Sequence, residues 1–497
     1  MLVLKRIRPW KIYFNRILEI KSVLIDKPVL QISFNKNTNI TDSLKEDNRT
    51  AWQRLSPYLK SIKIGDIAFR NANFQYIDHS SPKGKVTGLQ RLNIKITDLL
   101  IDSASQYDRS RLYNTKDIYA EFHSYKAITA DSNYTIQVQE FQASTAKRYA
   151  RLKGLRLIPG SGEMEFSKLF KYQKDRYSAS IEEVQLNNID YMLLNRDRRL
   201  LASALVLEKG NLSIFLNRAM PDSIRDKGLN FPQRALRRFQ LDTSIDTVLL
   251  RDSRLSYSEY NPDSRRKGTV TFSKINGRIL NLTNDSLSLI KNRFADLKLT
   301  ALLMDRGRFN VAMKLDLESP GAAFEFKGNV GNMDAGMFNA AIRPLSLILI
   351  RTGFLERMIF EGTGSIKGVI GSLTCYYNDL KITLLERSEE TNWLKRRGIA
   401  SIFANMLIIR GENPSPGQPV RKANFRYIRP QHSSFFNMIW KGLAEALLET
   451  IGFDSATQKE IHTRLRKMEI ERFDREERRD DRLKKRDVRR SNRNDNR

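Results

Sequence analysis

Apolar and polar residues alternate along most of the first 430 residues, and this alternation is typical of strands that bury one face. The clearest example lies between Ile62 and Tyr76, where two short apolar ladders flank the polar positions 70–73. Those polar positions predict a turn or a bulge between two strand segments. The pattern therefore predicts a mainly β fold.

One spacing of apolar residues recurs along the chain. The template is Ile64, Ile67, Phe69, Phe74 and Tyr76, and copies lie 44 residues earlier, 117 later and 181 later. The copies are Ile20, Val23, Ile25, Leu30 and Ile32; Ile181, Val184, Leu186, Tyr191 and Leu193; and Ile245, Val248, Leu250, Leu255 and Tyr257. We interpret the unit as strand, turn, strand. Repeated hairpins that bury one face on their neighbours predict a long, twisted antiparallel sheet.

Strands lengthen between residues 294 and 385, with turns at 305–307 and 319–321, and this indicates an antiparallel meander. A short helical interruption is expected over 333–338. Farther on, six residues at helical spacing predict an amphipathic helix: Phe436, Ile439, Trp440, Leu443, Leu447 and Ile451. The expected organisation is an N-terminal hairpin repeat and linker (1–60), a repeated β-hairpin groove (61–290), a C-terminal β-meander (291–430), the amphipathic helix (431–453) and a charged helical or disordered tail (454–497).

Composition adds a strong positive charge to this picture. The chain has 86 basic and 56 acidic residues and a formal net charge of +30, which attracts nucleic acid, anionic lipid and lipopolysaccharide alike. One cysteine, Cys375, excludes an internal disulfide and a zinc site of paired cysteines. No apolar run reaches the length of a transmembrane helix, and the first residues lack the apolar region of a signal peptide.

No catalytic motif is present, and we expect neither an enzyme nor a bound metal or cofactor. None of the four histidines has a partner at ligand spacing. His79 stands beside Asp78 and Ser80, but adjacent residues in a loop do not build a catalytic triad, and no Gly-x-Ser-x-Gly is found. The glycine-rich segment 362–368 lacks the Gly-Lys-Ser/Thr order of a phosphate loop and is predicted to be a strand. Cys375 is predicted to be a small residue facing the core.

The repeat and the end of the chain resemble the AsmA-like proteins, relatives of TamB. IKIGDIAFRNANFQYID (62–78) and VLIDKPVLQISF (23–34) are similar to hairpins of that family, and GTGSIKGVIGSLTCYYNDLKITLL (362–385) is similar to its Gly-strand-Tyr-x-Asp-Leu-Lys segment. NPSPGQPVRKANFRYIRPQHSSFFNMIWKGL (413–443) resembles the closing stretch of a Bacteroidota-type branch. The resemblance covers roughly residues 20 to 453.

The resemblance implies a twisted β-sheet rolled into a trough, anchored in the inner membrane and projecting into the periplasm. It implies phospholipid transfer or outer-membrane maintenance in the cell envelope, without enzymatic activity. Its implied partners are a phospholipid or other acyl lipid, an anionic membrane surface and envelope proteins, whereas nucleic acid is disfavoured. The candidate lipid-groove residues are Ile64, Ile67, Phe69, Phe74, Tyr76, Ile245, Val248, Leu250, Leu255 and Tyr257.

One departure from the family concerns the start of the chain. The family begins with a transmembrane helix and a β region, whereas Met1 here falls inside the repeat pattern. Inner-membrane association is therefore expected only if an anchor is encoded upstream.

Two other classes stay open at this point. The apolar face could pack only on the protein's own helices, as a structural β-scaffold without lipid. The basic chain could also associate with nucleic acid, although the acids interleaved in the tail favour pairing within a helix over a bare polycation.

Overall fold

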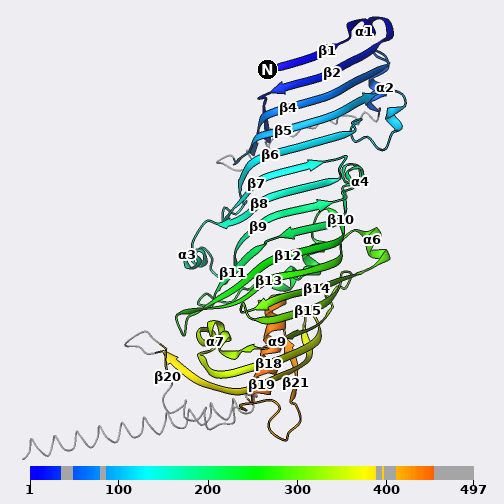
Figure 1. The fold of residues 1–497 in the computed structure, drawn as a ribbon. Coiled ribbons are helices and arrows are strands. Elements are labelled where there is room, and N and C mark those ends of the chain that lie inside the picture. The colour runs from blue at the N-terminus through cyan, green and yellow to red at the C-terminus, as the bar shows by residue number, and fades with distance from the viewer. Residues whose placement is uncertain (35–48, 79–84, 388–393, 397–409, 453–497) are drawn as a thin grey trace, which may run out of the picture.

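The computed structural model describes residues 1–34, 49–78, 85–387, 394–396 and 410–452. These residues form one long, twisted β-sheet in which strands stack one after another along the length of the molecule (Figure 1). The mainly β fold expected from the sequence is confirmed.

The N-terminal half contains β1 (Leu2–Ile7), α1 (Pro9–Asn15), β2 (Ile17–Asp26), β3 (Val29–Phe34), α2 (Ala51–Leu55), β4 (Ser61–Asp78), β5 (Lys85–Ile101), η1 (Ser105–Tyr107), β6 (Asp117–Ile128), β7 (Tyr134–Ser144), β8 (Tyr149–Pro159), α3 (Glu163–Lys168), β9 (Arg176–Asn187) and α4 (Tyr191–Asp197). Its helices are short. Figure 1 shows α1, α2 and α4 along one edge of the sheet.

The C-terminal half contains β10 (Arg199–Glu208), β11 (Asn211–Asn217), η2 (Lys227–Asn230), α5 (Pro232–Arg237), β12 (Asp242–Asn261), β13 (Arg266–Thr283), α6 (Ser286–Lys291), β14 (Phe294–Leu303), β15 (Gly307–Asp316), β16 (Phe324–Val330), β17 (Met333–Asp334), η3 (Ala335–Phe338), α7 (Asn339–Ser346), β18 (Ile348–Ser365), β19 (Gly368–Arg387), β20 (Leu394–Arg396), β21 (Lys422–Ile428) and α9 (Phe435–Thr450). The expected meander is present, because β14, β15, β16, β18 and β19 pair antiparallel in turn.

Parallel pairing explains the shortest repeat interval. β2 and β3 both run parallel to β4, so that Ile20 lies opposite Ile64 and Ile25 lies opposite Phe69. β10 and β11 run parallel to β12 in the same way, and Leu205 lies opposite Val248. Paired residues point to the same side of a sheet, so strands that share one apolar face repeat the same spacing.

A bulge, not a turn, separates the two halves of the template. β4 continues through positions 70–73, and the register of β4 and β5 shifts there. Asn71 adopts a left-handed backbone with φ 50°, and its N–H donates to the Asn93 side chain at 2.8 Å. β12 contains the same kind of bulge at Asp252 (φ 45°), whose N–H donates to the Asn276 side chain at 3.0 Å. Of the two alternatives predicted for positions 70–73, the bulge is confirmed and the turn is wrong, so the repeat unit is one bulged strand. The neighbouring asparagine satisfies the displaced N–H without a chain reversal.

The copy expected 117 residues after the template is only partly a strand. Ile181, Val184 and Leu186 lie on β9, but Tyr191 and Leu193 lie on α4, where the Asp190 side chain caps the Leu193 N–H at 2.9 Å. The structural counterpart comes one strand later, on β10 and β11: Ala202, Leu205, Leu207, Leu212 and Ile214. The sequence match failed because a short helix and a strand can share the same few apolar positions.

The expected segment boundaries at 60 and 290 do not interrupt the sheet, because β2 pairs with β4 and β13 pairs with β14 across them. The interruption expected over 333–338 contains β17 and η3, and α7 follows it unforeseen. The segment 362–368, predicted to be a strand, contains the end of β18, a two-residue turn at 366–367 and the first residue of β19. A Cβ at Gly364 would lie 2.4 Å from the Phe324 ring, so glycine leaves room for that ring. The tail at 454–497 lies outside the described residues.

The amphipathic helix is confirmed as α9, capped by Ser434, but its buried face differs from the expected stripe. The buried residues are Phe435, Met438, Gly442, Ala446 and Thr450, whereas Phe436 and Trp440 are exposed. α9 lies close to β19 and β21, and a Cβ at Gly442 would stand 2.8 Å from the Phe425 ring. Four of the six expected residues also pack against this core while partly buried: Ile439, Leu443, Leu447 and Ile451. The expected stripe is therefore shifted toward Phe435, Met438 and Gly442, where the helix approaches the sheet closely.

A buried ion pair joins the start of β10 to the N-terminus of α6. The Arg199 guanidinium donates to both Asp285 oxygens at 2.7 and 3.0 Å, and Asp285 also accepts from the Ser288 N–H at 2.9 Å. The hydrogen bond from Arg199 is the main reason that the pKa of Asp285 falls from 3.8 to about 2, against the opposing effect of burial.

We expect Asp285→Asn to lower the free energy of unfolding by about 2 kcal/mol at neutral pH, because it removes a charged pair but keeps a capping oxygen. The folded-state pKa lies below the unfolded value, so the stabilisation is complete above about pH 4 and is lost as the pH falls toward 2. Urea unfolding across this range measures the difference from wild type, and the exposed Asp246→Asn is the control. A difference that stays constant down to pH 2 would contradict this assignment.

Candidate functional site: an apolar face that crosses the sheet

A row of apolar side chains crosses the whole sheet without a charged residue. Each member is the register partner of the next, from β1 to β21, so all of them point to one side. The row continues through the C-terminal strands in the same way. Its members are Leu2, Ile25, Phe69, Ile94, Ala120, Ala143, Ala150, Leu186, Leu205, Val248, Ile279, Leu297, Met313, Phe326, Gly362, Gly371 and Phe425.

A second apolar row runs beside the first from β6 to β21. Its members are Phe122, Phe141, Leu152, Val184, Leu207, Leu250, Gly277, Leu299, Val311, Gly328, Phe360, Leu373 and Ala423. The Phe122 and Phe141 rings stack with centroids 5.0 Å apart. The two rows together make a broad apolar face.

The opposite face of the N-terminal half is polar and hydrogen-bonded. Asn93 donates to Glu121 at 2.9 Å, and the Tyr119 hydroxyl donates to the same carboxylate at 2.6 Å. Burial, together with the Glu121 carboxylate, raises the pKa of Tyr119. Farther along, Arg151 donates to Gln142 at 2.6 Å. The two faces of the sheet therefore differ sharply in character, which the alternation in the sequence predicts.

The apolar face has two environments. In the C-terminal half, helices cover part of it: Phe435 of α9 packs edge-on against Phe231, which precedes α5, and Phe326 on β16 is only 4% exposed. Ile279, Leu297 and Met313 in this half are partly exposed, whereas no member of the first row before Val248 is buried. In the N-terminal half, the members of the first row from β2 to β7 are partly exposed: Ile25, Phe69, Ile94, Ala120 and Ala143. We call these five residues the N-terminal apolar face. Their part of the sheet lies above β8 in Figure 1.

The ten residues predicted to line a groove are divided between these environments. Ile64, Ile67, Phe69 and Phe74 are partly exposed on β4, and Tyr76 follows them on that strand, where its side chain is outside the described residues. Their register partners on β5 are Leu99, Ile96, Ile94, Leu89 and Thr87.

The second five lie on β12. Ile245 and Val248 are buried in a cluster with Ile189 and Ala202, and Leu250 packs against that cluster. Leu255 and Tyr257 are partly exposed. The Tyr257 hydroxyl donates to Glu259 at 2.8 Å, and burial raises the pKa of Tyr257. This part of the face is thus packed by the protein itself.

Sequence reasoning missed three small members of the row. Ala120, Ala143 and Ala150 are consecutive register partners on β6, β7 and β8. They lie between the larger Ile94 and Leu186 in the row, so the side chains on this part of the face are small. The signal was present as an alternation of alanine with polar residues, but a search for large apolar residues passes over it.

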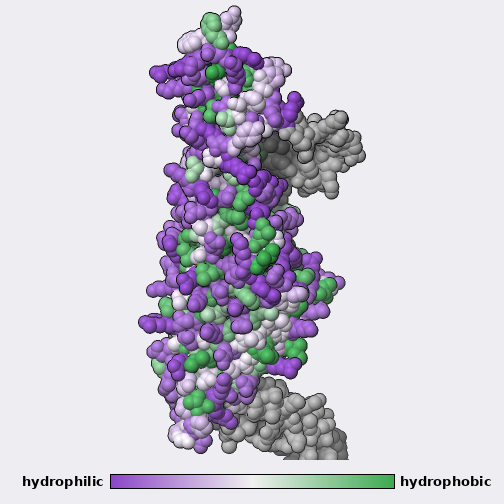
Figure 2. Space-filling view, turned by 90° about the vertical axis from the view of Figure 1, so that its right-hand side faces the viewer, coloured by the Kyte–Doolittle hydropathy of each residue, from purple (hydrophilic) through white to green (hydrophobic). Residues whose placement is uncertain are grey.

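One side of the molecule is mainly hydrophilic. Figure 2, which views the molecule from the side, shows hydrophilic residues over most of the described surface, with hydrophobic ones scattered among them. Among the described residues, no cluster of histidine, cysteine or acidic side chains could hold a metal ion. Cys375 is buried as expected, and burial raises its pKa to about 12. No described helix combines the length and the apolar character required to span a bilayer.

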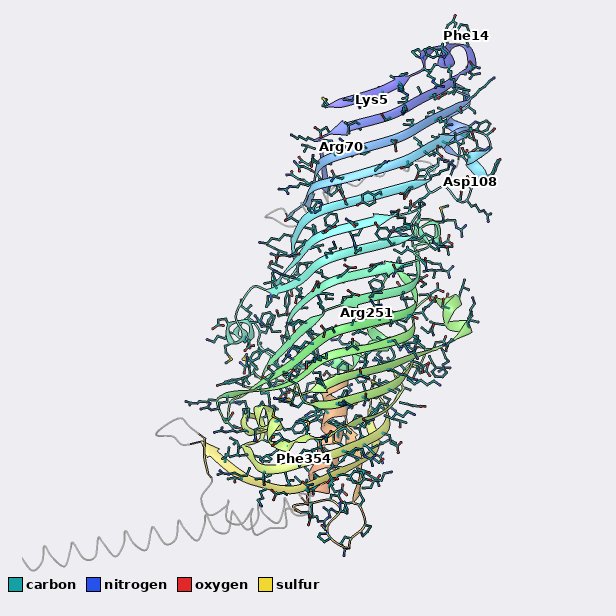
Figure 3. All side chains as sticks on the ribbon, viewed as in Figure 1. Lys5, Phe14, Arg70, Asp108, Arg251 and Phe354 are labelled. Carbon is teal, nitrogen blue, oxygen red and sulfur yellow. The ribbon has the colours of Figure 1, made fainter. Side chains whose placement is uncertain are left out.

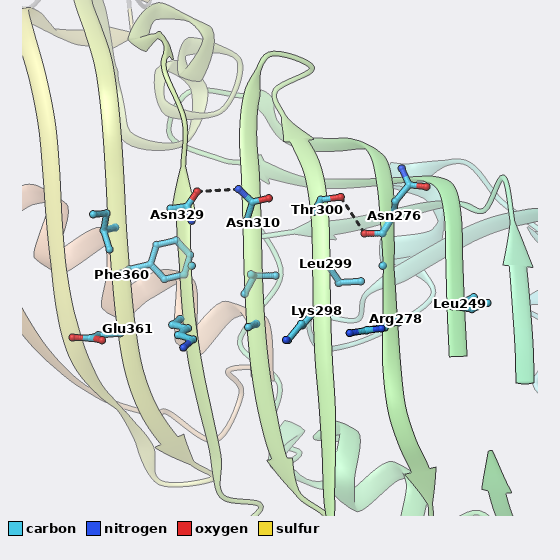
Figure 4. A pocket seen from close by; sticks show the side chains of 16 residues that line it. Leu249, Asn276, Arg278, Lys298, Leu299, Thr300, Asn310, Asn329, Phe360 and Glu361 are labelled. Atoms are coloured by element: carbon cyan, nitrogen blue, oxygen red, sulfur yellow. Dashed lines mark hydrogen bonds between the residues drawn. The ribbon is translucent and has the colours of Figure 1, made fainter. Parts of the chain in front are cut away.

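A shallow hollow of about 710 Å³ crosses the strands from β12 to β18 (Figure 4). Its centre follows Gly277, Leu299, Val311, Gly328 and Phe360 of the second row. The flanking residues are mostly polar: Leu249, Asn276, Arg278, Lys298, Thr300, Asn310, Ala312, Lys327, Asn329, Ile359 and Glu361. Asn310 donates to Asn329 at 3.0 Å. The lining contains one carboxylate and no histidine, serine or cysteine, so it does not offer the paired groups of an acid-base site.

Comparison with protein-family models and with curated proteins finds no match to this chain.

Proposed function

We propose that this protein is a non-enzymatic cell-envelope protein that binds phospholipid or another acyl lipid along the N-terminal apolar face, in lipid transfer or outer-membrane maintenance. The observation that carries the proposal is the unbroken apolar row from Leu2 to Phe425, partly exposed in its first half. An acyl chain is a flexible apolar cylinder, and each buried CH₂ group contributes about 0.8 kcal/mol. A row that crosses successive strands offers such a chain continuous contact.

Charge and resemblance support the same proposal. A net charge of +30 favours lipid phosphates near the protein surface. The resemblance to AsmA-like proteins adds a periplasmic location and an envelope role.

A structural β-scaffold without cargo is the second candidate. It is favoured by the packing of Ile245 and Val248 against residues of the same chain, with Tyr191 and Leu194 of α4 beside them. This packing shows that part of the apolar face needs no lipid to be covered. The N-terminal half therefore separates the two candidates.

A bulky side chain at Ala143 tests the proposal. Ala143→Trp places an indole on the apolar row between Ala120 and Ala150, where it would occupy the space of an acyl chain. We expect the variant to retain several-fold less co-purified lipid than wild type, measured by mass spectrometry, because a net loss of contact for even one CH₂ group, at about 0.8 kcal/mol, weakens binding about fourfold. His123→Trp is the matched control, because His123 is exposed on β6 and directly follows Phe122 of the second row.

Equal lipid in both variants, or wild-type protein that carries no lipid, would overturn the proposal and favour the scaffold. Melting temperatures establish that both variants are folded.

A further inference from the structure

Helix α1 presents large aromatic side chains to the surface at one end of the sheet. Trp10, Tyr13 and Phe14 are 60%, 84% and 78% exposed, and none of the seven residues of α1 is buried. The Tyr13 and Phe14 rings meet edge-on, with centroids 5.1 Å apart. Figure 3 labels Phe14 at this end, with Lys5 on the neighbouring strand β1. Three exposed aromatic residues on one short helix indicate a contact surface.

The internal duplication shows that the architecture does not require these aromatics. α4 is the counterpart of α1, because each helix follows a strand, ends at a left-handed arginine and leads into a strand parallel to the next long one. With Arg16 aligned to Arg198, the positions of Trp10, Tyr13 and Phe14 correspond to the following residues of α4: Met192, Asn195 and Arg196. Two of these three are polar, so the aromatics of α1 need a reason other than folding.

A fourth exposed aromatic residue is held beside α1. Arg16, which ends the helix, donates from Nε to the Tyr58 carbonyl at 3.1 Å and from a terminal nitrogen to the Ser56 carbonyl at 3.3 Å. The Lys60 N–H donates back to the Arg16 carbonyl at 2.7 Å. Tyr58 is 77% exposed. We call Trp10, Tyr13, Phe14 and Tyr58 the aromatic tip.

Positive charge surrounds the aromatic tip. The first nineteen residues contain five basic side chains and a single carboxylate, Glu19. Arg8 and Lys11 both contact Glu19, and the hydrogen bond from Lys11 is the main cause of its lowered pKa. Lys5, Arg6 and Arg16 therefore leave a net positive charge at this end of the sheet.

We propose that the aromatic tip docks on the surface of an anionic lipid bilayer. Tryptophan and tyrosine favour the level of the headgroups, where their rings are buried and their polar atoms stay hydrated. Basic residues beside them are attracted to anionic lipid. The proposal rests on the proposed function and deepens it, since it assigns the membrane contact to one end of the sheet, next to the N-terminal apolar face.

Vesicle flotation with the full chain tests the docking. Vesicles of phosphatidylcholine with phosphatidylglycerol are the anionic probe, and pure phosphatidylcholine vesicles are the neutral one. We expect wild type to bind the anionic vesicles and to lose binding as salt rises. The combined variant Trp10→Ser, Tyr13→Ser and Phe14→Ser should bind at least tenfold more weakly. Tyr107→Ser, which removes an equally exposed tyrosine from η1, should bind as wild type does.

Equal binding by wild type and the triple variant overturns the proposal, and so does wild-type protein that binds no vesicle or binds both kinds equally. Melting temperatures check that the triple variant is folded, which its exposed positions predict. Co-purified lipid on the Ala143→Trp variant reports on the apolar face alone, so a failure of docking is distinguished from a failure of lipid binding.

Discussion

Phe69→Asp is expected to deplete the co-purified lipid while the protein stays folded. Phe69 is partly exposed on β4, between its register partners Ile25 and Ile94, so an aspartate there keeps access to water. The loss of stability should be about 1 kcal/mol. An acyl chain that crosses a carboxylate, by contrast, must either desolvate that carboxylate or lose contact with the face around it. This should reduce the retained lipid by at least about tenfold. Thermal melting and lipid mass spectrometry on the same preparation measure both effects.

Phe326→Asp is the matched control, because Phe326 belongs to the same row at β16. Its side chain is 4% exposed and packs near the Phe324 and Phe360 rings. An unpaired carboxylate in this packed core should destabilise the fold by about 4 kcal/mol or more. If Phe69→Asp unfolded the protein as Phe326→Asp is expected to do, the N-terminal apolar face would be a dry core and the lipid path would be wrong.

Two neighbouring phenylalanines of α9 should respond very differently to truncation. Phe435→Ala is expected to lower the free energy of unfolding by about 3–5 kcal/mol, because it opens a cavity among the rings of Phe231 and Phe324, whose centroids lie 5.2 and 4.7 Å away. Phe436→Ala should change it by less than about 0.5 kcal/mol, since Phe436 is exposed. Chemical denaturation of the two variants gives the comparison.

A larger loss of unfolding free energy for Phe436→Ala than for Phe435→Ala would mean that α9 buries Phe436 and Trp440, as the sequence alone predicts. Equal effects would mean that the helix does not pack on the sheet in the orientation described.

Some of the candidate site could be predicted from residues alone. The spacing alone predicts that Phe69 and Val248 belong to an apolar face, and both lie on the row that crosses the sheet. The spacing is informative because neighbouring strands must match their apolar positions to share a face. The spacing does not predict how deeply each residue is buried. Val248 is buried by the α4 region, whereas Phe69 is partly exposed.

By itself, the amino-acid sequence determined the strand-rich fold, the 44-residue match between β2–β3 and β4, the C-terminal helix and the absence of paired cysteines. These are properties of local spacing and composition, which pleating and helical period translate directly into structure. The tertiary structure alone decided three things. It showed that Asn71 makes a bulge and not a turn, because the capping side chain of Asn93 comes from a neighbouring strand. It placed Tyr191 in a helix. It centred the buried face of α9 on Phe435, Met438 and Gly442 and left Phe436 and Trp440 exposed, because the approach of the helix to the sheet is set by residues far apart in the chain.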